Sequence, residues 1–169
     1  GKGRPAVAEA LHVARDILIA EYLAWPVHLA HISCSQSVEL IVWAKNKGVK
    51  VTAETCPHYL LYTDEMLMDY DTAAKVNPPL RTPEDKAYLR DALKDGVFDM
   101  LVTDHAPHAA HEKEEPLDEA PQGMMGLETA LPLTYSLVRE GVLTEKQLTA
   151  LWTTGPANVF KLPVNTFAQ

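Results

Sequence analysis

The chain has 169 residues, 47% of them hydrophobic, which is enough for one domain with a buried core. It carries 15 basic and 23 acidic residues, and the resulting net charge of −8 argues against a nucleic-acid backbone or an anionic membrane as its main partner. No apolar run approaches the roughly 20 residues of a membrane-spanning helix, and the amino-terminal residues lack the apolar stretch of a secretory signal. We therefore expect a cytoplasmic protein with no membrane segment.

The first half of the chain alternates between helix-like and strand-like segments. Apolar side chains recur at helical spacing over residues 6–23, and a short apolar run predicts a strand over residues 27–32. We expect a helix to follow this strand. It should end at Gly48, because glycine commonly terminates helices. Residues 49–54 predict a second strand, and we expect the polar stretch over residues 56–81 to be irregular.

The second half continues the same alternation. Thr82 and Pro83 begin a helix that extends to Lys94, since threonine caps helices and proline fits their first turn. Thr144 and Gln147 have the spacing of a capping box. The remaining predicted elements are a strand over 98–103, a long loop over 104–126, and helices over 127–139, over 144–153 and from Gly155 onward.

This element order predicts an α/β fold with parallel strands joined by right-handed crossovers. Three parallel strands are too few for a closed barrel, which needs eight strands and typically about 250 residues. The pattern therefore indicates either part of a barrel or a small open sheet.

Metal-competent and proton-transferring side chains follow each predicted strand. His31 lies at the end of the first strand, Glu54 and His58 lie near the end of the second, and Asp104 and His108 follow the third. Ligands of parallel α/β folds bind outside the carboxyl ends of the strands. The sequence thus predicts an active site at this edge of the sheet.

Asp104 and His31 are the strongest candidates, and each has a structural alternative. A carboxylate at a strand end can ligate a metal and exchange a proton with a metal-bound hydroxide, but an aspartate can also cap or stabilise a loop. His31 is either a metal ligand or a buried core histidine. His28 lies three residues earlier, so we expect it on the opposite face of the strand in a structural role.

Several further residues near these strand ends have open roles. His58 and His105 either orient metal ligands or form hydrogen bonds within loops. His111 lies in an acidic stretch that we expect to be exposed. Cys34 and Cys56 have no disulfide or zinc-finger spacing, and we expect them to be reduced and buried.

Two loop segments could contact a ligand. Asn77 offers both a donor and an acceptor, which suits an amide-bearing ring, although it also fits a turn before Pro78. Gly123 would allow its backbone N–H to approach a ligand closely.

The segment from Thr103 to His108, followed by Lys113, resembles the dihydroorotase signature of the amidohydrolase superfamily, in its bacterial single-enzyme type. Further segments along the chain resemble the same family in their order and spacing. They are His31-Ile32-Ser33, Val51-Thr52-Ala53-Glu54, Pro57-His58, Asn77-Pro78-Pro79-Leu80-Arg81 and Gly126-Leu127-Glu128-Thr129-Ala130.

The resemblance implies that residues 1–169 are the carboxyl-terminal portion of a (β/α)8 TIM-like metallo-hydrolase barrel. They would supply about strands six to eight with their flanking helices, without the amino-terminal barrel half and a small β-domain. The implied activity is zinc-dependent interconversion of N-carbamoyl-L-aspartate and dihydroorotate in pyrimidine biosynthesis, with one or two Zn²⁺ ions per site.

The resemblance also assigns roles to residues. They are ligation of one zinc by His31 and of the other zinc by Asp104, proton transfer by Asp104, and substrate binding by Asn77, His108, Gln122 and Gly123.

The sequence departs from the family pattern in ways that limit these expectations. No His-x-His occurs, Gln122 stands where an aromatic residue is expected, and Lys161 stands where glycine is expected. We expect the isolated chain to bind zinc weakly and to be inactive. The alternatives are a hydantoinase-type or allantoinase-type cyclic amidase, or a non-catalytic scaffold for aspartate transcarbamoylase. A homodimer or a complex with aspartate transcarbamoylase is the expected assembly.

Overall fold

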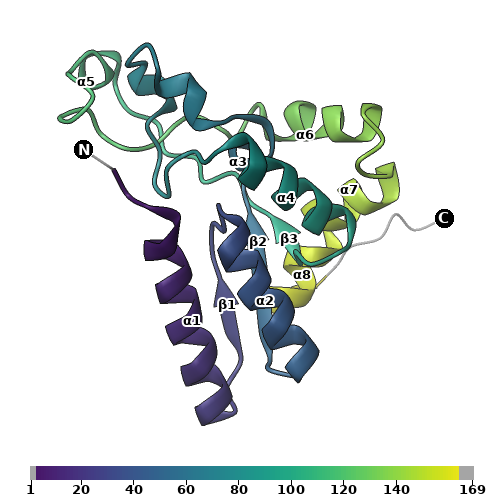
Figure 1. The fold of residues 1–169 in the computed structure, drawn as a ribbon. Helices are drawn as coiled ribbons and strands as arrows, with labels where there is room; N and C mark the ends of the chain where they lie inside the picture. Colours follow the sequence, from purple (N-terminus) through teal and green to yellow (C-terminus); the bar gives the residue numbers. More distant parts are fainter. Residues whose placement is uncertain (1–2, 164–169) are drawn as a thin grey trace.

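The computed structural model describes residues 3–163 and contains one parallel sheet of three strands (Figure 1). The strands β1 (Val27–Leu29), β2 (Val51–Thr55) and β3 (Met100–Leu101) are adjacent in that order. The carboxyl ends of all three strands therefore lie at one edge, as the element order predicts.

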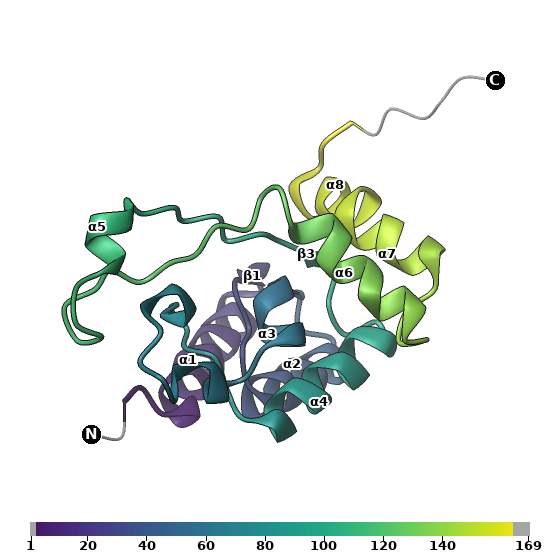
Figure 2. The same ribbon diagram turned by 90° about the horizontal axis from the view of Figure 1, so that it is seen from above.

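Helices connect the strands and cover the sheet. They are α1 (Ala6–Leu23), α2 (Ser35–Lys47), α3 (Pro57–Leu61), α4 (Pro83–Lys94), α5 (Ala110–Lys113), α6 (Ala130–Arg139), α7 (Glu145–Trp152) and α8 (Thr154–Phe160), with 3-10 turns η1 (Asp64–Leu67) and η2 (Thr72–Ala74). The helices α1 and α2 pack against each other and against β1 and β2, and α7 and α8 contact β3. Seen from above, α1, α2, α4 and the group α6–α8 form an arc around the strands (Figure 2).

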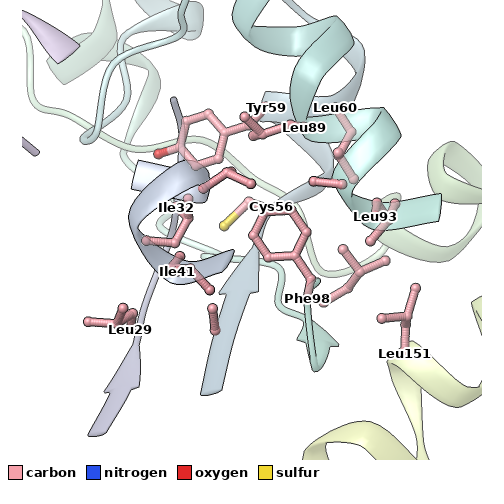
Figure 3. Close-up of a cluster of buried hydrophobic side chains, with 14 of the residues drawn as sticks. Leu29, Ile32, Ile41, Cys56, Tyr59, Leu60, Leu89, Leu93, Phe98 and Leu151 are labelled. Carbon is pink, nitrogen blue, oxygen red and sulfur yellow. The ribbon is translucent and has the colours of Figure 1, made fainter. Parts of the chain in front are cut away.

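The core lies between the strands and these helices (Figure 3). Ile41 of α2, Leu89 of α4 and Leu60 of α3 are completely buried, and Leu29 of β1 and Phe98 before β3 pack in the same cluster. Burial of each such side chain contributes about 1.5–3 kcal/mol relative to exposure. These buried side chains hold the helices against the sheet and keep the strand ends in place.

The strands are shorter than the sequence predicts, and the backbone after the first strand turns at His31. The predicted strand over 27–32 ends at Leu29, because His31 adopts φ 56° in the left-handed region. The Ile32 N–H still donates to the Glu54 carbonyl at 3.0 Å, so the chain stays beside β2. Likewise, only Met100–Leu101 of the predicted strand 98–103 forms ladder pairs.

The segment after β2 contains a helix where an irregular stretch is expected. The helix α3 begins at Pro57, whose fixed φ suits the first turn, and all of its residues except Leu61 are buried. The sequence signal is weak because five residues are too few to show helical periodicity.

Residues 104–126 extend away from the sheet and return to it (Figure 2). The two limbs are joined where the Ala106 N–H donates to the Met124 carbonyl at 3.0 Å. The single turn α5 interrupts the predicted loop. Lys113 in this turn donates to the carbonyls of Thr72 and Pro121 at 3.0 and 2.9 Å, which ties the loop to η2.

The carboxyl-terminal helices follow the predicted order. The capping box of α7 is confirmed, with the Gln147 N–H donating to Thr144 Oγ1 at 3.2 Å. The predicted helix over 127–139 begins three residues later, at Ala130. Lys161 ends α8 with φ 55°, a conformation that suits the glycine expected there. The carboxyl end, where the resemblance expects a β-domain, lies outside the described residues.

Within residues 3–163, no helix has the length and apolar character needed to cross a membrane.

Candidate active site

His31 and Asp104 meet at the carboxyl edge of the sheet, as the sequence predicts. The His31 Nδ1 atom lies 3.8 Å from Asp104 Oδ1, and both side chains are partly exposed. Both backbones adopt the left-handed region, with φ 56° at His31 and 48° at Asp104. This conformation costs roughly 1–3 kcal/mol at a non-glycine residue, and such strain is often concentrated at functional sites.

Glu54 joins this pair from β2 and binds two histidines. Its carboxylate accepts a hydrogen bond from His28 Nε2 at 2.9 Å and lies 3.4 Å from His31 Nε2. The expectation that His28 and His31 face opposite sides is therefore wrong, because the strand ends before His31 and its alternation does not continue. Thr52 completes the arrangement, since its hydroxyl lies 2.8 Å from His28 Nδ1.

The donor set at the strand ends fits a metal ion such as zinc. One ligand atom from each of His31, Cys56 and Asp104 lies within 4.8 Å of the others. Imidazole, thiolate and carboxylate are all zinc ligands with bonds of about 2.0–2.3 Å, and the His31–Asp104 spacing suits two ligands of one ion. Glu54 on the far nitrogen of His31 is the kind of partner that orients a metal-ligating histidine.

Cys56 belongs to this cluster, although the sequence predicts only a buried, reduced thiol at this position. It is fully buried, and loss of hydration raises its thiol pKa, with Asp104 and Glu54 adding to the effect. Cys34 is also free and buried, and burial raises its pKa to about 11. Without a bound metal, both thiols are therefore neutral near pH 7.

His58 and His105, whose roles the sequence leaves open, have different environments. His105 Nδ1 accepts hydrogen bonds from the backbone N–H groups of Gly126 and Leu127, each at 3.1 Å, so it holds the returning loop. His58 is buried, and its Nε2 has no hydrogen-bond partner among the described residues. Loss of hydration and, to a smaller extent, the neighbouring His31 lower the His58 pKa to about 4, so the ring is neutral near pH 7. His111 is exposed in α5, as expected.

The predicted substrate-binding residues also come together. His108 Nε2 donates to the Gln122 carbonyl at 3.1 Å. A Cβ atom on Gly123 would lie only 2.7 Å from the Cβ atom of Ala106 and 3.1 Å from His108 Nε2, and its φ of 139° also requires glycine. The glycine therefore permits the close approach of the two loop limbs at His108.

Arg4 links this loop to Asn77, a contact that no pattern in the sequence predicts. Its guanidinium donates to Asn77 Oδ1 and, at 3.3 Å, to Gln122 Oε1. The Tyr59 hydroxyl of α3 donates to the Pro78 carbonyl at 2.7 Å, so the Asn77–Pro78 segment is also tied to the helix after β2.

A buried ion pair positions the turn after β1 and the segment after Asn77. Arg81 lies 3.3 Å from Glu9 of α1, and both side chains are about nine-tenths buried. Arg81 also donates to Ser33 Oγ at 3.0 Å, and Glu9 accepts from the Ser33 N–H at 3.0 Å. Since Ser33 is two residues after His31, this network holds the turn that presents His31.

Curated relatives match nearly the whole chain. It is 50% identical over 166 residues to the dihydroorotase of Acetivibrio thermocellus and 51% identical over 166 residues to that of Pelotomaculum thermopropionicum. Each match covers 98% of this chain, and the chain spans 39% of the length of either relative.

Solved structures of similar fold include a D-hydantoinase at 34% identity and TM-score 0.86, and the L-hydantoinase of Arthrobacter aurescens at 30% identity and TM-score 0.89. They cover 92% and 94% of this chain, and this chain covers 36% of each. The predicted partial metallo-hydrolase barrel of the α/β class is thereby confirmed. Residues 3–168 match the Amidohydrolase family, and the chain belongs to that family.

Proposed function

We propose that this chain forms the part of a zinc-dependent dihydroorotase barrel that contains strands six to eight. The observation that carries the proposal is the meeting of His31 and Asp104 at the carboxyl ends of β1 and β3, 3.8 Å apart, with Glu54 behind His31. The dihydroorotases at about 50% identity support the same assignment. The reaction is the interconversion of N-carbamoyl-L-aspartate and dihydroorotate in pyrimidine biosynthesis.

His31 and Asp104 would hold the metal in this site. A bound Zn²⁺ polarises a carbonyl and lowers the pKa of a bound water toward neutrality. Glu54 accepts from His28 and faces His31 Nε2, which leaves His31 Nδ1 directed toward Asp104. The Glu54 carboxylate thereby fixes the orientation of the His31 ring.

Asp104 would move the proton in the reaction. Its carboxylate is partly exposed at the strand end, where it can accept a proton from the attacking water and return it to the leaving amide nitrogen. Asn77, His108, Gln122 and Gly123 would hold the substrate ring from the opposite loops. Gly123 is suited to this because a side chain there would collide with Ala106.

The test is a chimera in which this chain replaces the matching segment of the Acetivibrio thermocellus relative. We expect the chimera to hydrolyse dihydroorotate, and Asp104→Asn to lower kcat by about a thousandfold, because a general base typically contributes 10²–10⁴-fold. Asp95→Asn is the matched control, since Asp95 is exposed at the end of α4. A folded chimera whose activity survives Asp104→Asn would contradict the proposal.

A hydantoinase-type reaction is the second candidate, because the similar solved structures include hydantoinases. Assays of the same chimera with dihydroorotate, hydantoin and allantoin separate the two. We expect the highest kcat/KM for dihydroorotate, and a preference for hydantoin would favour the alternative. A non-catalytic scaffold predicts no turnover of any of the three by the folded chimera.

A further inference from the structure

We propose that His28 and Thr52 are positioning residues that act through Glu54 on the metal-ligating ring of His31. The inference rests on the proposed function, and it adds two residues that lie one contact further from the metal ligands than Glu54 does. His28 thereby gains a role in the chemistry of the site, where the sequence predicts only a structural one.

The residues that carry the proposal form a row on one face of the sheet. His28 of β1 and Thr52 of β2 are register partners, so their side chains lie next to each other on the same face. Glu54 follows two positions later on β2 and shares that face with Thr52. Leu29 and Ala53 alternate to the opposite face, where they belong to the hydrophobic core. The row therefore leads along the strands to the candidate site at their carboxyl ends.

The two carboxylate oxygens of Glu54 face different histidines. Oε2 accepts from His28 Nε2 at 2.9 Å, and Oε1 lies 3.4 Å from His31 Nε2. The Glu54 side chain is only 6% exposed, so water is a poor substitute for either partner. The carboxylate cannot rotate without losing the hydrogen bond from His28, and that bond therefore sets the direction in which Oε1 points.

The ring of His28 is itself held by two neighbours. The Thr52 hydroxyl lies 2.8 Å from His28 Nδ1, and it can donate to that nitrogen when the proton of the ring is on Nε2. Phe160 of α8 packs against the ring at an angle of 61°, with 5.7 Å between the ring centroids. These contacts keep the Nε2–H group of His28 directed at Glu54, so Thr52 acts on the same carboxylate through His28.

The consequence appears at the two nitrogens of His31. A carboxylate beside Nε2 favours the tautomer that carries its proton there, which leaves the lone pair of Nδ1 free. That Nδ1 lies 3.8 Å from Asp104 Oδ1, and a metal ion fits between two such acceptors. The row from Thr52 to Glu54 thus selects the form of His31 that is able to bind a metal.

A polar row is unusual at this place in a parallel sheet. The strands of such sheets are normally apolar on both faces, and apolar side chains would need no hydrogen-bond partners there. Here His28, Thr52 and Glu54 satisfy one another instead, and the last of them faces a metal ligand. Partners that orient a metal-ligating histidine in this way typically contribute 10–100-fold to metal affinity.

The first test measures zinc affinity in the chimera described above, by competition with a chromophoric chelator. We expect His28→Leu to raise the zinc dissociation constant at least about fivefold, because it removes the donor that holds Glu54. We expect His28→Gln to remain within about twofold of the parent, because its amide NH2 group can replace Nε2–H. His12→Leu is the matched control, since His12 is exposed on α1. A smaller rise in His28→Leu, or an equal rise in His28→Gln, overturns the proposal.

The second test reads the tautomer of His31 directly, by nuclear magnetic resonance of the metal-free chimera with labelled histidines at about pH 8, above the ordinary histidine pKa of about 6.5. We expect the proton on Nε2 in the parent and a larger fraction on Nδ1 in His28→Leu and in Thr52→Val. Thr134→Val is the control for Thr52→Val, because it also removes a buried hydroxyl, one that bonds within α6 and to Trp152.

An unchanged His31 tautomer in Thr52→Val overturns the proposal even if His28→Leu does not fold. The proposed function fails separately, if the parent chimera folds but neither binds zinc nor hydrolyses dihydroorotate. An active parent whose zinc affinity is unchanged in His28→Leu rejects the positioning role alone.

Discussion

His58 shows how burial sets the chemistry of a single residue next to the site. It is 3% exposed, it stacks edge-on against Tyr59, and its Nε2 has no partner among the described residues. Loss of hydration and, to a smaller extent, the neighbouring His31 lower its pKa to about 4. A neutral imidazole is the form that this environment accepts, because a charged ring would lose its hydration without gaining a counter-ion.

This shift predicts a loss of stability in acid. Between pH 6.5 and pH 4 the unfolded state binds a proton at residue 58 and the folded state does not, so unfolding becomes easier as the pH falls through this window. The contribution of His58 is fully present above pH 6.5 and falls by about 3 kcal/mol by pH 4. Urea unfolding of the metal-free chain at several pH values measures this change.

His58→Gln is expected to reduce that pH dependence, because glutamine does not titrate. His111→Gln is the matched control, since His111 is exposed and should leave the dependence unchanged. An acid profile that is the same in His58→Gln as in the parent would show that other groups cause it.

At the scale of elements, α2 begins without a side-chain cap of its own. Cys34 occupies the N-cap position and makes no capping hydrogen bond. The cap comes instead from α4, where Asp85 Oδ1 accepts from the Ser35 N–H at 2.8 Å and from Ser35 Oγ at 2.7 Å. This contact joins the amino-terminal ends of α2 and α4 through two residues that are 50 positions apart in the sequence.

Asp85→Ala is therefore expected to cost about 1–2 kcal/mol of unfolding free energy, because it removes a helix cap and leaves the Ser35 N–H without its acceptor. Denaturant unfolding measures the loss. Asp91→Ala is the control, because Asp91 is exposed on the same helix and its side chain has no hydrogen-bond partner among residues 3–163. Equal losses in the two variants would argue against capping by Asp85.

At the scale of the whole molecule, we expect the chain to provide only part of a metal site. The described residues place His31 and Asp104 together, with Cys56 held as a neutral thiol by its burial. Zinc sites in proteins normally have at least three protein ligands. The expected homodimer or complex with aspartate transcarbamoylase stays a prediction.

We therefore expect the isolated chain to bind zinc about a hundredfold or more weaker than the chimera with the Acetivibrio thermocellus relative, and to show no hydrolase activity. Equilibrium dialysis followed by metal analysis tests the first point. His31→Asn should lower zinc retention in the chimera, whereas His12→Asn, on the exposed face of α1, should not. Stoichiometric zinc in the isolated chain after dialysis would contradict this expectation.

The sequence by itself determined the features that depend on neighbouring residues. The helical spacing of residues 6–23, the cap at Thr144 and the position of Asp104 after a buried strand are local patterns, and the structure contains all three. Local patterns are readable because helix periodicity and capping join residues only three or four positions apart.

Only the tertiary structure decided which distant side chains meet. Glu54 binds His28 and faces His31 because the strand ends early and His31 turns to a positive φ, which period-two alternation does not anticipate. Arg4 reaches Gln122 across 118 positions because Arg81 and Glu9 anchor its backbone. Such contacts depend on crossovers and loop closure, and those are set by packing of the whole chain rather than by any short stretch of it.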